Sequence, residues 1–146
     1  MTIDHFRGEH AFLSNFYAAP VTYRGVPYPS VEHAYQAAKS DPPAAHLAGV
    51  SAANAKKMGR GLRLRPDWEQ VKVGVMRDLL RLKFAIPELR AMLLATGDAR
   101  LVESNSWGDS FWGVYHGRGE NWLGRLLVEV REEIRAEHSD QGVDER

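Results

Sequence analysis

The sequence predicts an α+β fold with a helical majority, formed by a single compact domain with a few short β-strands. Apolar residues recur at spacings of three and four in two long segments, 66–85 and 122–135, which is the period of an amphipathic helix. The clearest strand pattern is short and lies at 21–28. With 146 residues and no internal repeat, the chain suits one domain with its own core. We assign residues 1–138 to this domain and expect 139–146 to form a disordered tail.

The first half of the chain predicts a hairpin followed by short helices. Residues 21–28 read VTYRGVPY, in which the Arg-Gly pair supplies the turn of a β-hairpin. Ser30 can cap a helix, which the Asp-Pro-Pro sequence at 41–43 ends. Ser51 can cap another short helix, which ends near Gly59.

The second half predicts longer helices and a glycine-rich loop. The segment 66–85 has an apolar stripe made of Trp68, Val71, Val75, Leu79 and Leu82. Pro87 begins another helix, and a short strand is expected at 101–103. Residues 105–119 have no clean period and predict a loop. Asn121 then caps a last helix. Its core face is formed by Leu123, Leu126, Leu127, Val130 and Ile134. Its charged face is formed by Arg131, Glu132, Glu133 and Arg135.

The composition excludes several classes of protein. Lys plus Arg and Asp plus Glu are both 19, so no overall positive charge favours nucleic acid, although a local patch remains compatible with it. There is no cysteine, and the six histidines lack the spacing of metal ligands, so we expect neither a metal nor another cofactor. The first residues lack the pattern of a signal peptide, and no apolar run reaches the ~20 residues of a membrane span. We therefore expect a cytoplasmic protein.

The helix that follows Ser30 carries a polar stripe in a short space. At about 100° per residue, Glu32, Gln36 and Lys39 lie one above another. This stripe is compatible with an ordinary solvated helix face. It is also compatible with a carboxylate and an amine in a cleft, where each shifts the pKa of the other.

Lys83 lies between apolar neighbours near the end of the longest helical pattern. A lysine at such a position usually buries its methylenes and extends its charge to water. The other interpretation is that Lys83 binds an anionic group or pairs with a buried carboxylate.

Two aromatic segments are candidates for binding a planar ligand. In SWGDSFW, Trp107 and Trp112 flank Asp109 in a loop, which suits a base that stacks on the rings beside an acid. Asp109 could instead cap the turn of that loop. In FLSNFY, the Asn15 amide can both donate to and accept from a base edge, or it can form an Asx-turn.

Seven segments, in order, resemble the NADAR, or YbiA-like, family. They are FLSNFY, YPSVEHAYQAAK, AKKMGR, DWEQVKVGVMRDLLRLKF, LLATG, LVESNSWGDSFWG and GENWLGRLLVEVR. Each is modest alone, but their order and spacing along residues 6–135 are specific. The resemblance implies a mostly helical α+β domain that acts as an N-glycosidase and needs no metal. One branch of the family hydrolyses phosphorylated riboflavin-pathway intermediates, and another removes ADP-ribose from guanine in nucleic acid, often beside the toxin that attaches it.

The resemblance also implies the site residues. The family's glutamate in EHAYQ falls on Glu32, the lysine after AYQAA on Lys39, and the helix tryptophan on Trp68. Its Trp-Gly-Asp loop falls on Trp107 and Asp109, while Ser106 replaces the usual aspartate and Trp112 fits only loosely.

We therefore predict hydrolysis of a ribosyl C–N bond. Glu32 and Asp109 would stabilise positive charge on the sugar, activate water or protonate the leaving nitrogen. Lys39 would keep Glu32 ionised or form a Schiff base with the opened sugar. The expected substrate-binding residues are Arg7, Ser14, Asn15, Phe16, Gln36, Trp68, Lys83, Trp107, Trp112 and Asn121.

The expected partners are a nucleotide or ADP-ribosyl small molecule, ADP-ribosylated DNA or RNA, and an ADP-ribosyltransferase toxin, with no membrane. Arg60, Arg63 and Arg65 could line a channel for nucleic acid. Two other classes stay open: a non-catalytic module that binds NAD or ADP-ribose, and a structural domain without a ligand.

Overall fold

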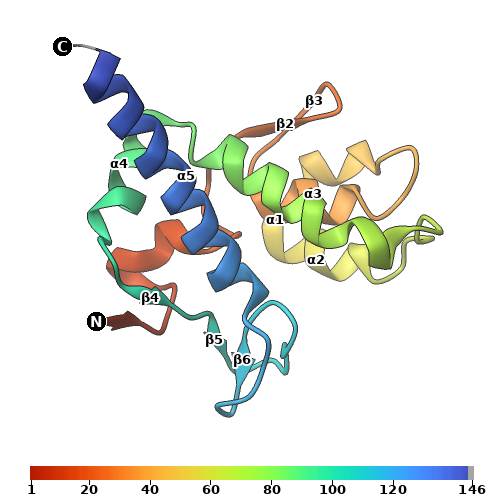
Figure 1. Cartoon of the computed structure of the whole chain (residues 1–146). Helices are drawn as coiled ribbons and strands as arrows, with labels where there is room; N and C mark the ends of the chain where they lie inside the picture. Colours follow the sequence, from red (N-terminus) through yellow and green to blue (C-terminus); the bar gives the residue numbers. More distant parts are fainter. Residues whose placement is uncertain (145–146) are drawn as a thin grey trace. The chain divides into compact units, whose positions relative to one another are not determined.

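The computed structural model describes residues 1–144 and divides into two compact units (Figure 1). The central unit consists of residues 14–83. The terminal unit consists of residues 1–13 together with the chain from Phe84 to the C-terminus. Helices predominate and the strands are two or three residues long, which confirms the predicted fold class.

The central unit begins with the predicted hairpin. Strands β2 (Val21–Tyr23) and β3 (Val26–Tyr28) pair antiparallel, with Val21 opposite Tyr28. The two turn residues, Arg24 and Gly25, have φ of 48° and 80°. Both angles are left-handed, as a two-residue turn between right-twisted strands requires.

Three α-helices complete the central unit, with a 3₁₀ segment, η2 (Ala45–Gly49), between the first two. Ser30 caps α1 (Val31–Ala37) by accepting a hydrogen bond from the His33 amide, as predicted. Ser51 caps α2 (Ala52–Gly59) in the same way. The third helix is α3 (Trp68–Lys83). Every residue of α1 is buried, because β2, β3, η2, α2 and α3 all pack against it.

The buried face of α3 differs from the predicted stripe at its C-terminal end. Trp68, Val75 and Leu79 are buried as expected, but Leu82 is 44% exposed. Lys83 takes the buried position instead, four residues after Leu79. The face therefore ends on a charged residue, for which the structure supplies a specific partner.

The terminal unit combines short strands with two helices. Strand β1 (Thr2–Ile3) pairs parallel with β4 (Arg100–Leu101), and the 3₁₀ segment η1 (Gly8–Leu13) follows β1. Helix α4 (Pro87–Ala95) has proline in its first turn and ends before Gly97, whose φ is 62°. Strand β5 (Ser104–Asn105) pairs parallel with β6 (Val114–Tyr115), so the predicted loop at 105–119 holds a short ladder that its sequence did not indicate.

The last helix, α5 (Trp122–Asp144), buries its predicted core face and also one residue of the face that was expected to be charged. Arg131, expected to face water, is buried, and its guanidinium donates to the Thr96 hydroxyl and the Ala99 carbonyl at 2.9 Å each. These bonds satisfy acceptors just after α4. The helix continues past Ser139, where the disordered tail was expected to begin, and residues 145–146 lie outside the described residues.

Across residues 1–144, no helix is both long and apolar enough to cross a membrane.

Candidate functional site

Glu32 is the buried carboxylate of the central unit. It lies in the first turn of α1, is 7% exposed, and accepts a hydrogen bond of 2.9 Å from Gln36 Nε2 one turn later. Burial raises the pKa of Glu32, while the Gln36 hydrogen bond and the charges of Lys56, Lys39 and His33 oppose that rise. A carboxyl group with a raised pKa and a hydrogen-bonded oxygen is suited to exchanging a proton.

Lys39 supplies the amine that the helical wheel predicted beside this carboxylate. It follows α1, is partly buried, and holds its Nζ 5.7 Å from the centroid of the Tyr35 ring. Burial lowers the pKa of Lys39, and the cations Arg60, Lys56 and Lys72 lower it further, whereas Glu32 raises it. An amine with a lowered pKa is neutral more often, which favours nucleophilic use.

A network of hydrogen bonds fixes the first turn of α1. The His33 ring donates from Nε2 to the Val50 carbonyl at 2.7 Å, and its Nδ1 shares a hydrogen bond with the Ser30 hydroxyl, also at 2.7 Å. The Glu32 amide donates to the Asn15 carbonyl at 3.0 Å. The backbone at the start of α1, which carries Glu32, is therefore fixed by hydrogen bonds to the Asn15 and Val50 carbonyls.

Gly59 allows α2 to approach the Glu32–Gln36 pair closely. A Cβ atom at position 59 would overlap the side-chain amide of Gln36. The last turn of α2, which includes Lys56, therefore lies directly against Gln36. Gly59 was predicted only as a helix end, and its packing role depends on a contact between α1 and α2 that the sequence alone does not show.

The turn Ser14–Tyr17 borders α1 and α3. The Ser14 hydroxyl accepts from the Phe16 amide at 3.1 Å, and the Ser14 carbonyl accepts from the Tyr17 amide at 3.1 Å. The same carbonyl accepts from Lys83 Nζ at 2.8 Å. Lys83 is 0% exposed, and its burial lowers its pKa to about 7. The structure thus gives Lys83 a backbone partner, and its predicted contact with phosphate stays a prediction.

Asn15 has an incompletely satisfied buried amide. Its side chain is 9% exposed, and its Nδ2 meets only the sulfur of Met76, at 3.6 Å. Its Oδ1 is buried and has no hydrogen-bond partner among residues 1–144. Buried polar atoms are nearly always paired in folded proteins, so this amide is a candidate for binding a polar ligand.

The other predicted residues of the central unit are aromatic. Phe16 is exposed, and the Nζ of Lys56 lies 5.7 Å from its ring centroid. Trp68 is buried and packs on Tyr35, with ring centroids 5.3 Å apart and an interplanar angle of 54°. Phe16 is thus open to solvent, whereas Trp68 is a core residue that packs against Tyr35.

Asp109 belongs to the terminal unit, where it organises its own loop. Its Oδ1 accepts from the amides of Phe111 and Trp112 at 3.0 and 2.9 Å. The Asn105 side chain bonds both the amide and the carbonyl of Asp109. Asp109 therefore caps the turn, one of its two expected roles, and its catalytic role stays a prediction.

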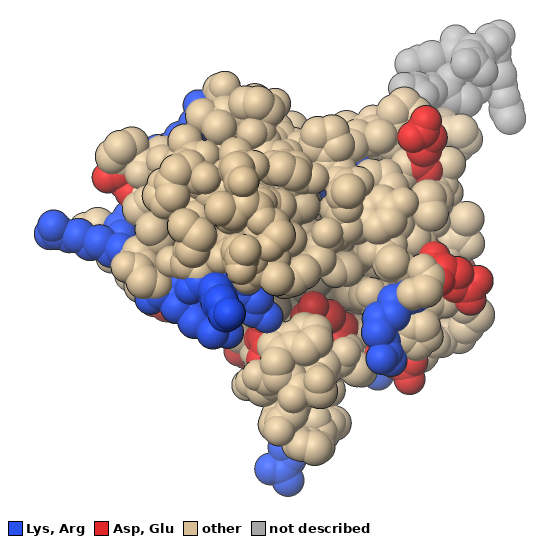
Figure 2. Space-filling view, turned by 180° about the vertical axis from the view of Figure 1, so that it is seen from behind, with Lys and Arg blue, Asp and Glu red and all other residues tan. Residues whose placement is uncertain are grey.

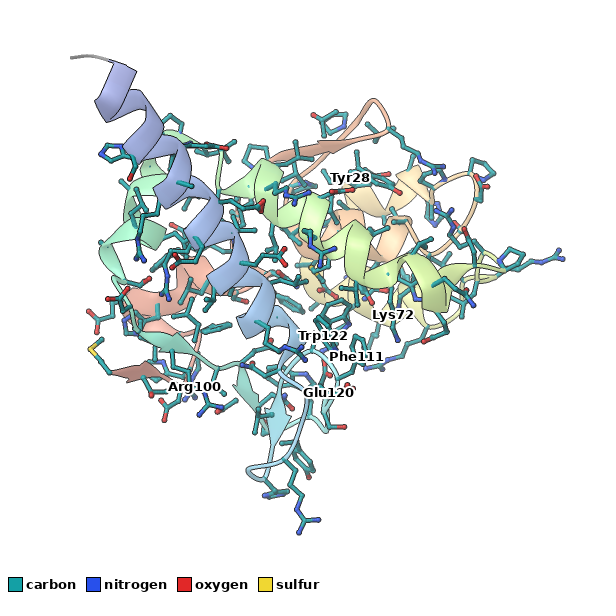
Figure 3. All side chains as sticks on the ribbon, in the orientation of Figure 1. Tyr28, Lys72, Arg100, Phe111, Glu120 and Trp122 are labelled. Atoms are coloured by element: carbon teal, nitrogen blue, oxygen red, sulfur yellow. The ribbon has the colours of Figure 1, made fainter. Side chains whose placement is uncertain are left out.

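The aromatic residues of this loop divide into two kinds. Trp107 is 58% exposed. Trp112 meets Phe111 edge to face at 4.9 Å, and Phe111 stacks on Trp122 at 6.3 Å (Figure 3). Trp112 is thus part of a packed cluster, while Trp107 is the more exposed of the two tryptophans.

Asn121 and Arg7 complete the predicted set in the terminal unit. The Asn121 side chain accepts from the Glu103 amide and donates to the Leu101 carbonyl, so it ties β4 and the next residues to the start of α5. With φ of 52°, Asn121 does not make the predicted side-chain cap of α5. Arg7 is exposed.

Among the described residues, no group of His, Asp and Glu side chains could hold a metal ion. The chemistry available in the central unit is that of a buried carboxyl group, an amide and nearby amines. Lys56 and Gly59 were absent from the predicted site, and their position in AKKMGR, one of the family segments, is the sequence signal that points to them.

Known proteins resemble this chain in sequence over most of its length. N-glycosidase YbiA of Escherichia coli is 43% identical over 88% of this chain and 84% of its own length. N-glycosidase Npun_R5314 of Nostoc punctiforme is 41% identical over 84% of this chain and 85% of its own. Riboflavin biosynthesis protein VVA0006 of Vibrio vulnificus is 43% identical over 89% of this chain, which spans only 37% of that longer protein.

The fold agrees with a solved structure and with a family model. The NMR structure of the E. coli protein YbiA matches with a TM-score of 0.81 at 41% identity, covering 94% of this chain and 87% of that one. A model described as the NADAR domain matches residues 4–135 and so runs through both units. The chain is therefore a member of the NADAR family.

Proposed function

We propose that this chain hydrolyses the N-glycosidic bond of a phosphorylated ribosyl compound, with Glu32 as the central carboxylate. The enzyme class rests on family membership and on relatives named N-glycosidase that align over most of their length. The single structural observation that carries the assignment is the buried Glu32 carboxylate, which Gln36 holds by a hydrogen bond and Lys39 and Lys56 influence by their charge.

The reaction breaks the C1–N bond of the sugar and joins the oxygen of water to C1. Positive charge builds on the sugar as the base leaves, and an ionised Glu32 beside C1 would stabilise it. Glu32 would then take a proton from the attacking water, and the leaving nitrogen would gain a proton. The raised pKa of Glu32 suits such an exchange.

Lys39 has two candidate roles. As an ammonium it would keep Glu32 ionised through their mutual attraction. As a neutral amine it would attack C1 of the opened sugar and form a Schiff base with loss of water. Borohydride should then trap a sugar–protein adduct that Lys39→Ala abolishes, and a wild-type enzyme that gives no adduct during turnover would leave only the electrostatic role.

Two substrate classes fit this chemistry. Phosphorylated riboflavin-pathway intermediates agree with the name of the Vibrio relative. ADP-ribosylated guanine, free or in DNA or RNA, contains the same kind of ribosyl C–N bond. In that case the enzyme would reverse the product of an ADP-ribosyltransferase.

The test is a substrate panel with a matched pair of variants. The panel contains riboflavin-pathway intermediates, ADP-ribosyl-guanosine and ADP-ribosylated DNA, and the readout is release of free base or sugar. Glu32→Gln should lower kcat by about 10²- to 10⁴-fold, as expected for the loss of an acid–base group, whereas the exposed Glu88→Gln should not. Full turnover of Glu32→Gln would overturn the assignment.

A non-catalytic module would give a different pattern. It would bind ADP-ribose in a calorimeter, yet chromatography would detect no base released from any compound of the panel.

A further inference from the structure

Gln36 is a buried amide whose two polar atoms face different neighbours. The side chain is 5% exposed, and its Nε2 donates to Glu32 Oε1 at 2.9 Å. Its own Oε1 is buried and has no hydrogen-bond partner among residues 1–144. An amide enclosed in this way has little surface to offer a substrate, although Gln36 was predicted to bind one.

Gly59 determines which end of the Gln36 amide faces Glu32. A Cβ atom at position 59 would fall on Gln36 Oε1, so the Cα–H bond that takes its place points at that oxygen. A Cα–H group is a weak donor and cannot accept a hydrogen bond. If the amide turned over, Nε2 would lose Glu32 and gain no acceptor from Gly59, while Oε1 would face the carboxylate. The observed orientation is therefore the stable one when Glu32 is ionised.

The hydrogen bond from Gln36 has two consequences for Glu32. It joins two side chains one turn apart on α1, so it holds the carboxylate in one orientation. Gln36 occupies Oε1 of the carboxylate, which leaves Oε2 to act on water or on the sugar. Because Nε2 is a donor, the bond also favours the ionised carboxylate over the neutral acid.

Other groups act on Glu32 through their charge. They are Lys56 of α2, Lys39 just after α1, and His33 of α1 itself. Of the other elements packed against α1, β2, β3 and η2 contain no Asp, Glu, Lys or Arg, His46 of η2 is exposed, and Lys72 of α3 acts on Lys39. Burial raises the pKa of Glu32, and the Gln36 hydrogen bond opposes that rise more strongly than any of these charges does.

Surface charge and the Gln36 hydrogen bond differ in how salt affects them. Figure 2 shows several Lys and Arg side chains gathered on one part of the surface, although the whole chain carries no formal net charge. Salt screens the influence of exposed charges, but it screens an interaction between two buried side chains much less. The effect of Gln36 on Glu32 should therefore persist at high ionic strength.

We propose that Gln36 is a positioning residue that orients the Glu32 carboxylate and keeps it ionised, and that it does not bind the substrate. The inference rests on the proposed function for its effect on turnover, but the ionisation of Glu32 can be measured without turnover. Loss of the donor should raise the pKa of Glu32. The acid limb of the pH profile of kcat/KM, which reports the free enzyme, should then move to higher pH.

The experiment compares Gln36→Met with wild type from pH 5.5 to pH 8, at low and at high salt, on the compound of the substrate panel that turns over fastest. Methionine has a similar length but no donor. At pH 5.5 kcat/KM should fall by about tenfold or more, the loss expected when a hydrogen bond to a charged group is removed. The loss should be several-fold smaller at pH 8, where Glu32 ionises more readily in both proteins, and KM there should change by less than about twofold.

The matched control is Gln70→Met, because Gln70 is exposed on α3. It should leave the pH profile unchanged. A loss in Gln36→Met that is equal at every pH and comes with a raised KM would overturn the proposal, since it would identify an amide that binds the substrate. Unchanged kinetics with a lower melting temperature would overturn it as well, since Gln36 would then serve packing alone.

Gln36→Glu is a second variant, with nearly the same shape as wild type. Its carboxyl group would lie beside that of Glu32, and two neighbouring carboxylates do not ionise together easily. The acid limb should therefore move to higher pH, as in Gln36→Met. This variant decides the question if Gln36→Met does not fold, and an unmoved acid limb would contradict the proposal.

An NMR titration of the Glu32 carboxyl carbon separates this inference from the proposed function. The pKa of Glu32 should be higher in Gln36→Met than in wild type and unchanged in Gln70→Met. If that difference appears while the substrate panel shows no turnover, only the proposed function fails. If the panel shows turnover that depends on Glu32, yet Glu32 titrates alike in all three proteins, only the role of Gln36 fails.

Discussion

Glu32 combines a proposed catalytic role with an unfavourable burial. Its carboxyl group is buried at the start of α1, and that burial raises its pKa above the ordinary value of 4.5. The folded state therefore holds the proton more tightly than the unfolded chain does. Stability due to this group is present at low pH and is lost as pH rises from about 4.5 through the folded-state pKa.

We expect Glu32→Gln to become more stable relative to wild type as pH rises from 4.5 to 7. The neutral amide pays no cost of ionisation, and it can still accept the hydrogen bond from Gln36. The measurement is the difference in melting temperature between variant and wild type at pH 5 and pH 7.5. A difference that stays constant or reverses would show that Glu32 is well compensated in its ionised form.

Lys83 gives a pH dependence of the opposite sign. Its folded-state pKa is about 7, below the ordinary 10.5. Between these values the unfolded chain binds more protons, so wild-type stability rises with pH from about 7 to about 10.5. A neutral Lys83 can still donate to the Ser14 carbonyl.

Lys83→Met should lack this dependence. The measurement is the unfolding free energy in urea, taken as the variant minus wild type. This difference should be lower at pH 9 than at pH 6.5 by on the order of a few kcal/mol. Lys57→Met, at an exposed position, serves as the control. Identical pH profiles for Lys83→Met and wild type would mean that the buried amine does not titrate in this range.

The contacts of single residues were predictable from the sequence where the two partners are close together along the chain. The Gln36–Glu32 hydrogen bond follows from a spacing of four on a helix. The burial of Lys83 in place of Leu82 does not follow from spacing, because it depends on the Ser14 carbonyl, distant in sequence. Arg131 is the same kind of case, since its acceptors lie beyond α4.

At the scale of elements, the contact between α1 and α2 sets the geometry of the proposed site. We expect Gly59→Ala to destabilise the protein by about 1–3 kcal/mol and to lower activity, since its Cβ would overlap the Gln36 amide and displace the partner of Glu32. Unfolding in urea and steady-state kinetics on the same preparation measure the two effects.

Gly74→Ala is the matched control for this substitution. Gly74 lies inside α3, and nothing within 4 Å would meet an added Cβ. Alanine there should stabilise the helix by about 0.5–1 kcal/mol and leave activity unchanged. If Gly59→Ala behaves like Gly74→Ala, α2 can shift at no cost and does not position Gln36.

The helices were easier to predict than the strands. The caps Ser30 and Ser51 and the start of α4 at Pro87 depend on nearby residues, and the structure confirms them. The parallel pairs β1–β4 and β5–β6 were missed because two-residue strands have no period, and their partners lie far away in sequence or beyond a loop.

At the scale of the whole molecule, the NADAR match runs through both units, whereas the best-supported chemistry lies in the central one. The ordered family segments made the enzyme class predictable, because they cover residues of both units. The division of the chain into two units was not predictable, since neither its composition nor its periodicity changes near Ser14 or Lys83.

Substitutions of Asp109 can test whether the terminal unit contributes to the reaction itself. Its Oδ1 already accepts two backbone hydrogen bonds. Asp109→Asn keeps an oxygen acceptor for the Phe111 and Trp112 amides but removes the charge, whereas Asp109→Ala removes both. Asp109→Ala should therefore lose about 1–3 kcal/mol of stability, because two amides lose their acceptor.

If Asp109 also acts in the chemistry, Asp109→Asn will melt within a degree or so of wild type yet turn over about tenfold more slowly or worse. We expect this outcome, since the turn uses only one of the two carboxylate oxygens. Melting curves and kcat for both variants decide the matter. Full turnover in Asp109→Asn, together with a destabilised Asp109→Ala, would show that the carboxylate serves only the turn and would leave Glu32 as the one catalytic carboxylate of the proposal.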